Sequence, residues 1–280
     1  MQHTHIAGHS DSSAWVLDGA TGLTSRRLLP GPSDAAWLAE AYHRGLEARA
    51  GATRVGLRAL FTELIDSVGS RLHRPDIAAE RYELPSAGIV FVRLQPQGRL
   101  EYARLGDCRA ILRCGQGAGA RTVSTRRSPL HRPDARVIRQ IASLIRSGRA
   151  RDYAEARKTS TVEEAPRANR ALQNTKGGYW VLGLDPAAAR HMETGSVALP
   201  DGQGGIGLLV SDGFYRLVDT FHFFGSDAAL LDAALSGGLG PLLGRLRDVE
   251  EADRGCRDYP RLKPRDDATA LLFTFSGPAR

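Results

Sequence analysis

Cysteine is scarce in this chain of 280 residues, which holds only Cys108, Cys114 and Cys256 and no CxxC spacing. An odd and widely spaced set excludes a disulfide framework and a thiolate zinc site, so we expect three reduced thiols. Long apolar runs are also lacking, since no stretch approaches the ~20 uninterrupted apolar residues of a membrane helix. The start, MQHTHIAGHSDSS, has neither a basic lead nor an apolar core. The sequence therefore predicts no export signal and a cytoplasmic protein.

Charge is unevenly distributed along the chain. The formal net charge is +7, and much of the excess is arginine between Arg121 and Arg170. A basic surface can contact nucleic acid or an acidic partner. Few aromatic residues stand among these arginines and no recognition helix is visible, so we expect a solvated basic face. With 42% hydrophobic and 25% charged residues, the composition indicates a globular protein, and we expect one domain.

Two kinds of apolar periodicity divide the chain. Helical spacing predicts helices within 33–50, where Ser33 is the cap, within 53–70 and 133–159, and one or two helices within 227–255. Short β-prone runs predict a meander of hairpins over 86–124 and further strands at 14–17, 178–185, 194–199, 206–210 and 267–275. Hairpins throughout, interrupted by helices, indicate an α+β fold in which helices cover antiparallel sheets.

Three strand boundaries carry aspartate. WVLDGATG ends in Asp18, LLVSDGF ends in Asp212, and RDDATALLFTF begins its strand after Asp266 and Asp267. Strand ends can gather carboxylates from distant sequence around Mg²⁺ or Mn²⁺, which prefer oxygen ligands. Glycine after Asp18 lets the backbone come close, so the carbonyl of Gly19 can add a ligand. Each motif taken alone is equally consistent with a turn, because Asp-Gly is a common turn dipeptide.

Four motifs in this order are more specific than any one of them. LDGATG, ARLGDCRAIL, LLVSDGF and RDDATALL together resemble the signature of the metal-dependent Ser/Thr protein phosphatases of type 2C. The resemblance extends from Ala14 to Phe275, and GYWVLGLDP also resembles a segment of bacterial members. It implies a four-layer α-β-β-α sandwich of two antiparallel sheets flanked by helix pairs. It also implies a single domain over 1–280 with an Arg-rich helical insertion, or flap, at 126–170.

The resemblance implies a chemistry as well. Two Mn²⁺ or Mg²⁺ ions hold a water, lower its pKa and place it for in-line attack on phosphorus. Asp18 would bridge the two ions, the carbonyl of Gly19 would complete one of them, and Asp212 and Asp266 would bind the other. Asp107, in GDCR, matches a position that holds a third ion in some members. The implied substrate is a protein carrying phosphoserine or phosphothreonine, and the implied role is to oppose a Ser/Thr kinase.

The sequence departs from the family pattern at several positions. No Arg precedes Asp18, and Asp11 is the one acidic residue upstream, either an outer-shell ligand or a polar loop residue. Phosphate binding would then need a substitute such as Arg26, unless that residue is a surface charge. Arg216 stands where many members place an acidic residue, and a cation there opposes a third ion. Asp267 stands where many members have Asn, and we expect it beside the metal ligands rather than among them.

Two other functions remain open from the sequence. The first is a pseudophosphatase that keeps the fold and acts by binding a kinase or a regulator; the short start and Arg216 favour it, and the retained aspartates oppose it. The second is a nucleic-acid-binding module that uses the Arg-rich segment, which steep salt dependence of binding would support. His3, His5 and His9 crowd the N-terminus, where we expect a mobile or solvated start rather than metal ligands.

Overall fold

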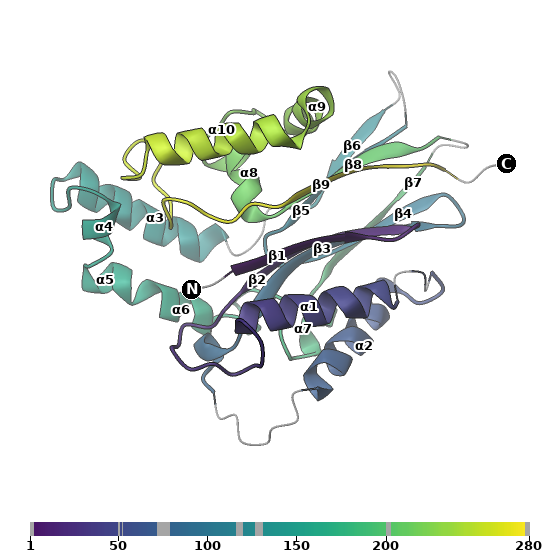
Figure 1. The fold of residues 1–280 in the computed structure, drawn as a ribbon, viewed down its shortest axis with the longest axis horizontal. Helices are drawn as coiled ribbons and strands as arrows, with labels where there is room; N and C mark the ends of the chain where they lie inside the picture. The colour runs from purple at the N-terminus through teal and green to yellow at the C-terminus, as the bar shows by residue number, and fades with distance from the viewer. Residues whose placement is uncertain are drawn as a thin grey trace.

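Two antiparallel sheets form the centre of the computed structural model, which describes residues 3–49, 51, 53–71, 79–115, 120–126, 131–199 and 203–277. The strands are β1 (His3–His9), β2 (Ser13–Ala20), β3 (Ser86–Gln95), β4 (Arg99–Leu105), β5 (Arg109–Cys114), β6 (Arg121–Ser124), β7 (Glu193–Ala198), β8 (Gly205–Val210) and β9 (Ala270–Phe275). The strand orders are β1-β2-β3-β4-β7 and β6-β5-β8-β9. The sheets lie against each other with helices outside both (Figure 1). The predicted α+β sandwich is confirmed.

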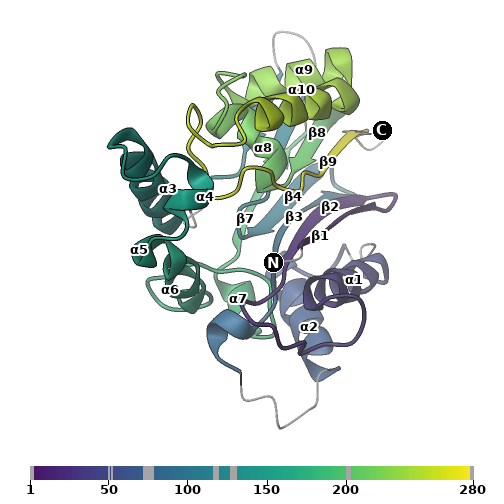
Figure 2. The same cartoon turned by 60° about the vertical axis from the view of Figure 1, so that its left-hand side comes forward.

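Helices cover both outer faces of the sandwich and one of its ends. They are α1 (Asp34–Glu47), α2 (Leu57–Ser70), η1 (Arg81–Glu83, a 3-10 helix), α3 (His131–Arg146), α4 (Tyr153–Ala156), α5 (Ser160–Glu163), α6 (Ala165–Ala171), α7 (Ala187–Arg190), α8 (Asp212–Asp219), α9 (Asp227–Gly237) and α10 (Leu239–Ala252). Helices α1 and α2 lie on the first sheet, α9 and α10 on the second, and α3 to α6 gather at one end (Figure 1 and Figure 2). No helix in the described part of the chain is long and apolar enough to cross a membrane.

Strand β2 is buried on both of its faces, which explains the apolar run AWVL. Trp15 and Leu17 pack against α1 and α2, whereas Ala14 and Val16 belong to the layer between the two sheets. Side chains alternate along a strand, so Asp18 continues the face of Ala14 and Val16. The first of the predicted acidic strand ends therefore points into the space between the sheets, at its edge.

The N-terminal segment differs from the expected solvated start. Residues 3–9 form β1, which pairs antiparallel with β2 and places His5 opposite Asp18. Gly8 packs against the indole of Trp15, because a Cβ at Gly8 would lie 2.5 Å from Trp15 Cε2. Polar residues on an edge strand give little hydrophobic alternation, which is why the strand has a weak sequence signal.

One strand prediction is wrong. Residues 178–185, all of which are described, form isolated bridges instead of a strand, because Asn174 Oδ1 accepts from the backbone N–H of Val181 at 2.9 Å. The antiparallel hairpins predicted over 86–124 are confirmed, but they do not form one continuous meander: β3 pairs with β4 in one sheet, and β5 pairs with β6 in the other. The chain crosses between the sheets at Gly106, whose φ of +79° suits glycine.

The predicted helices are largely confirmed. Ser33 caps α1, since its Oγ accepts from the backbone N–H of Ala36 at 3.0 Å. The expected interruption near Gly237 separates α9 from α10 at Gly238, which has a φ of +78°. The helical stretch expected over 133–159 is broken into α3 and α4 around Gly148. Residues 127–130, at the start of the predicted insertion, lie outside the described part of the chain.

Candidate active site

Asp18 and Asp212 meet although they are distant in sequence. Asp18 lies in β2, Asp212 opens α8 directly after β8, and their carboxyl groups are hydrogen-bonded to each other. Burial, together with the charges of Asp107 and Asp266, raises the pKa of Asp18 to about 7. Burial and the neighbouring carboxylates also raise the pKa of Asp212 well above its ordinary value. The pair therefore has too little positive charge around it to ionise fully at neutral pH.

The residues on either side of Asp212 place it by contacting the chain just before β9. Ser211 binds the chain just before β9, where its backbone N–H donates to the carbonyl of Thr269 at 3.0 Å and its Oγ accepts from Thr269 N at 3.1 Å. Gly213 makes room for the neighbouring segment, because a Cβ there would lie 1.9 Å from the carbonyl oxygen of Asp267. Asp212 itself occupies the first turn of α8, where the helix dipole favours a negative charge.

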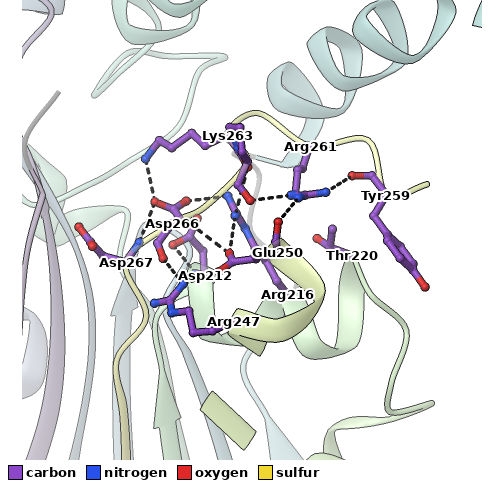
Figure 3. Close-up of polar contacts among 12 residues, drawn as sticks. Asp212, Arg216, Thr220, Arg247, Glu250, Tyr259, Arg261, Lys263, Asp266 and Asp267 are labelled. Atoms are coloured by element: carbon purple, nitrogen blue, oxygen red, sulfur yellow. Dashed lines mark hydrogen bonds and ion pairs between the residues drawn. The ribbon is translucent and has the colours of Figure 1, made fainter. Parts of the chain in front are cut away.

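Asp266 lies beside this pair and is held by two cationic side chains (Figure 3). Its Oδ2 accepts from Arg216 Nη2 at 2.7 Å, and its Oδ1 accepts from Lys263 Nζ at 2.8 Å. Glu250 from α10, only 2% exposed, accepts from Arg216 Nη1 at 3.2 Å and pairs with Arg247. Both carboxylate oxygens of Asp266 are thus engaged by cations of the protein itself.

A cavity of about 230 Å³ opens above the aspartates. Asp18, Asp107, Asp212 and Asp266 line it together with Lys263. Its roof is the segment 131–171, α3 to α6, which we call the flap. Flap residues in the lining include Val137, Ile141, Val162, Arg157 and Arg170. The basic segment seen in the sequence therefore provides one wall of the cavity.

The flap is attached to the rest of the molecule on two sides. Arg170 reaches the first sheet, where its Nη2 donates to the carbonyl of Thr21 at 2.7 Å and its Nη1 donates to Ser86 Oγ. Tyr153 binds the loop that follows α10, because its backbone N–H donates to the carbonyl of Gly255 at 3.1 Å and its hydroxyl donates to the carbonyl of Leu262. These contacts hold the flap in position over the cavity.

Most of the remaining predicted site residues adjoin the aspartate pair, and Asp11 does not. Asp107, in the turn after β4, lines the cavity, and Gly19 lies in β2 between Thr4 and Ala87. Asp267 is next to the site, but its side chain is 61% exposed. Asp11 lies in the exposed turn between β1 and β2, roughly 20 Å along the strand from Asp18.

Arg26 is not brought to the cavity either. It is an exposed residue of the loop after β2, and it lines a different hollow together with Arg27 and Tyr82. Its backbone N–H donates to Thr24 Oγ1 at 3.1 Å, which is a local turn contact. The cations that do line the cavity are Lys263, Arg157 and Arg170, so the structure places other residues where the sequence suggested Arg26 for phosphate binding.

Comparison with known proteins gives structural matches only. No protein-family model matches the chain, and no curated protein matches it in sequence. Among solved structures, the serine/threonine phosphatase PstP/Ppp of Mycobacterium tuberculosis matches with a TM-score of 0.51 at 15% identity, over 98% of this chain and 92% of that one. The chain has the fold of the type 2C phosphatases. The fold implied by the sequence motifs is thereby confirmed.

Other matches to the type 2C fold have similar coverage. The phosphatase MsPP of Mycobacterium smegmatis, solved with cacodylate, matches with a TM-score of 0.46 at 16% identity, over 98% of this chain and 91% of that one. PppA of Pseudomonas aeruginosa matches with a TM-score of 0.47 at 13% identity, over 97% of this chain and 90% of that one.

His5 is a site residue that the sequence did not indicate. Its Nε2 lies 3.3 Å from Asp18 Oδ1 and 3.8 Å from Asp267 Oδ2, and its side chain is 9% exposed. The expectation of solvated N-terminal histidines is therefore wrong for His5, because β1 carries it into the edge of the site. HTHIAGH carries only a weak strand signal, because a polar edge strand shows little hydrophobic alternation. Glu250 and Lys263 had none, since no motif marks α10 or the loop after it.

The donor set fits a divalent cation at one place in the site. Asp18 and Asp212 offer buried carboxylate oxygens whose charge Lys263 and Arg216 compensate only in part, which suits a hard cation. Asp266 does not fit as well, because its oxygens already bind Arg216 and Lys263. Within the described residues, no three His, Cys, Asp or Glu side chains are arranged to hold a metal ion.

The raised pKa of Asp18 predicts how the metal-free protein responds to pH. The folded-state pKa of about 7 exceeds the ordinary carboxyl value of 3.8, so the folded state binds the proton more tightly than the unfolded state. This stabilisation is fully present below about pH 4 and is lost as the pH rises through about 7. Urea unfolding in EDTA between pH 4 and 8 should show the loss. Asp18→Asn should flatten it, and parallel profiles for the two proteins would contradict the assignment.

Proposed function

We propose that this chain is a metal-dependent phosphatase that hydrolyses phosphoserine or phosphothreonine in a protein substrate. The observation that carries the proposal is the buried Asp18–Asp212 pair at the floor of a cavity that Lys263 and Arg157 also line. Carboxylates that attract a metal ion and cations that attract a phosphoryl group then face the same space. The type 2C fold supports this activity.

Asp18, Asp212 and the backbone carbonyl of Gly19 are the proposed ligands of a divalent cation. When bound, Mn²⁺ or Mg²⁺ would supply an acidified water as nucleophile and neutralise charge on the phosphoryl oxygens. The sequence also predicts Asp266 as a ligand of a second ion and Asp107 as a ligand of a third. Those two assignments stay predictions, and the contacts of Asp266 with Arg216 and Lys263 argue against its role as a metal ligand.

The other residues of the cavity would bind and orient the phosphorylated side chain. Lys263 is one-third exposed and lies between Asp266 and the cavity, so its ammonium can meet a phosphoryl oxygen. Arg157 is exposed on the flap and can draw the phosphate dianion inward. Apolar flap residues such as Val137 and Ile141 keep bulk water away from the roof, which strengthens these charge interactions.

We further propose a cytoplasmic enzyme that opposes a Ser/Thr kinase. The second candidate function is a pseudophosphatase that binds a phosphorylated partner without turning it over. One observation favours it: Arg216, buried and paired with Glu250, occupies an oxygen of Asp266 that a metal ion would otherwise use. The retained Asp18–Asp212 pair favours the enzyme.

Hydrolysis of a phosphothreonine peptide by the full chain distinguishes these two functions. We expect phosphate release that requires Mn²⁺ and stops in EDTA, because the nucleophilic water depends on the ion. Phosphopeptide binding without phosphate release, measured on folded and Mn²⁺-loaded protein, would favour the pseudophosphatase. Release that continues undiminished in EDTA would contradict metal dependence.

A further inference from the structure

Two cationic side chains of the protein, Arg216 and Lys263, bind Asp266 and compensate its charge, as a metal ion would. Arg216 and Lys263 bind different oxygens of the carboxylate, at 2.7 and 2.8 Å, and the Asp266 side chain is only 9% exposed. The backbone N–H of Asp267 also donates to Oδ1, at 3.2 Å. A metal ion on Asp266 would have to displace one of these cations or bind directly beside it, and the second arrangement is disfavoured by repulsion between like charges.

Arg216 is held in place from the side away from Asp266. Its Nη1 binds Glu250 Oε1 at 3.2 Å and the carbonyl of Lys263 at 3.4 Å. Glu250 is buried, and it also accepts from the backbone N–H of Asp266 at 3.3 Å and pairs with Arg247. Displacing the guanidinium would leave a buried carboxylate with less compensation, which is strongly unfavourable. Asp266, Arg216 and Glu250 therefore form a closed set of contacts, drawn in Figure 3.

The same two cations also face the aspartate pair. The charge of Arg216 stabilises the ionised form of Asp212, and the charge of Lys263 does the same for Asp18. Both cations bind Asp266, so a second divalent ion that used Asp266 would lie close to them. When ionised, Asp18 and Asp212 carry two negative charges between them, which one divalent cation compensates.

We propose that Arg216 and Lys263 replace one metal ion, so that the chain binds a single divalent cation at Asp18 and Asp212. This inference rests on the proposed function, because it concerns the same centre. It assigns Arg216 a positive role in place of the third-ion ligand that many members have there. It also makes Asp266 a partner of protein cations rather than a metal ligand.

The number of bound ions tests this proposal without an activity assay. The full chain, stripped with EDTA, is dialysed against Mn²⁺, and bound manganese is counted per chain by metal analysis while its EPR spectrum reports whether neighbouring ions are spin-coupled. We expect one uncoupled Mn²⁺ in the wild-type protein. In the double variant Arg216→Met/Glu250→Gln we expect two coupled ions, because both charges of the buried pair are removed and Oδ2 of Asp266 is released.

Two further variants keep the result interpretable. Arg254→Met/Glu251→Gln removes an exposed ion pair from the same region, with side chains 73% and 62% exposed, and should still bind one ion. Lys263→Met frees the other oxygen of Asp266 and should tighten binding of a second ion at least tenfold, even if the buried double variant does not fold.

Each stoichiometry has a distinct meaning. Two ions in the wild-type protein would overturn the replacement but leave the proposed function intact. One ion in the wild type, in the folded double variant and in Lys263→Met would also overturn it, since no second site is released. No bound ion in the wild type would overturn the metal-dependent function itself.

Discussion

Asp18→Asn is expected to lower Mn²⁺-dependent hydrolysis of a phosphothreonine peptide by about a thousandfold or more. The ion contributes several kcal/mol to stabilising the transition state, and each 1.36 kcal/mol is a factor of ten in rate. Asp18 is central to this effect because it is buried, hydrogen-bonded to Asp212 and close enough to Asp107 and Asp266 for their charges to raise its pKa. Initial rates at saturating Mn²⁺ measure the loss.

Asp11→Asn is the matched control for this substitution. Asp11 precedes Asp18 in the sequence but lies in an exposed turn at the other end of β2, so its activity should equal that of the wild type. Asp18→Asn should remain folded in EDTA, because it removes one member of a self-repelling acidic group. An Asp18→Asn protein that retains more than a tenth of wild-type activity would refute the site assignment.

Glu250→Ala is expected to cost about 3–5 kcal/mol of unfolding free energy, because it leaves Arg216 as an incompletely compensated buried charge. In a chain of this size such a loss lowers the Tm by about 10 °C. Thermal unfolding in EDTA measures the change without a contribution from bound metal.

Glu251→Ala, one residue further along α10, provides the comparison. Glu251 is exposed and pairs with Arg254 on the surface, so its loss should change stability by only about 0.5 kcal/mol. Arg216→Met/Glu250→Gln should recover part of the stability lost in Glu250→Ala, since it removes both charges. Equal Tm values for the two alanine variants would show that the buried ion pair contributes little.

The sequence predicted the parts of the site that depend on local pattern. Asp18 and Asp212 come at the ends of apolar runs, and the glycine after each is required where the backbone comes close, so the runs marked both positions and the resemblance of the ordered motifs implied their roles. The cap of α1 at Ser33 and the break between α9 and α10 are local in the same way. Ordered motifs then indicated the sandwich, which the fold confirms.

The parts that could not be predicted depend on long-range contacts. The partners of Asp266 come from α8, α10 and the loop between α10 and β9, and no motif in the sequence links Glu250 to Arg216. Arg26 follows the first motif in sequence, but its loop turns away from the cavity. His5 reaches Asp18 through strand pairing, which a polar edge strand does not reveal.

The packing of the flap bears on how this region can be exchanged between proteins. Its apolar core joins Val137, Ile141 and Tyr153 to Cys256 and Leu262, which lie about a hundred residues further along the chain. A chimera that swaps residues 131–171 alone would match a foreign flap to the native loop after α10. The transferable module is therefore discontinuous: the flap and residues 253–263 have to be inherited, or grafted, together.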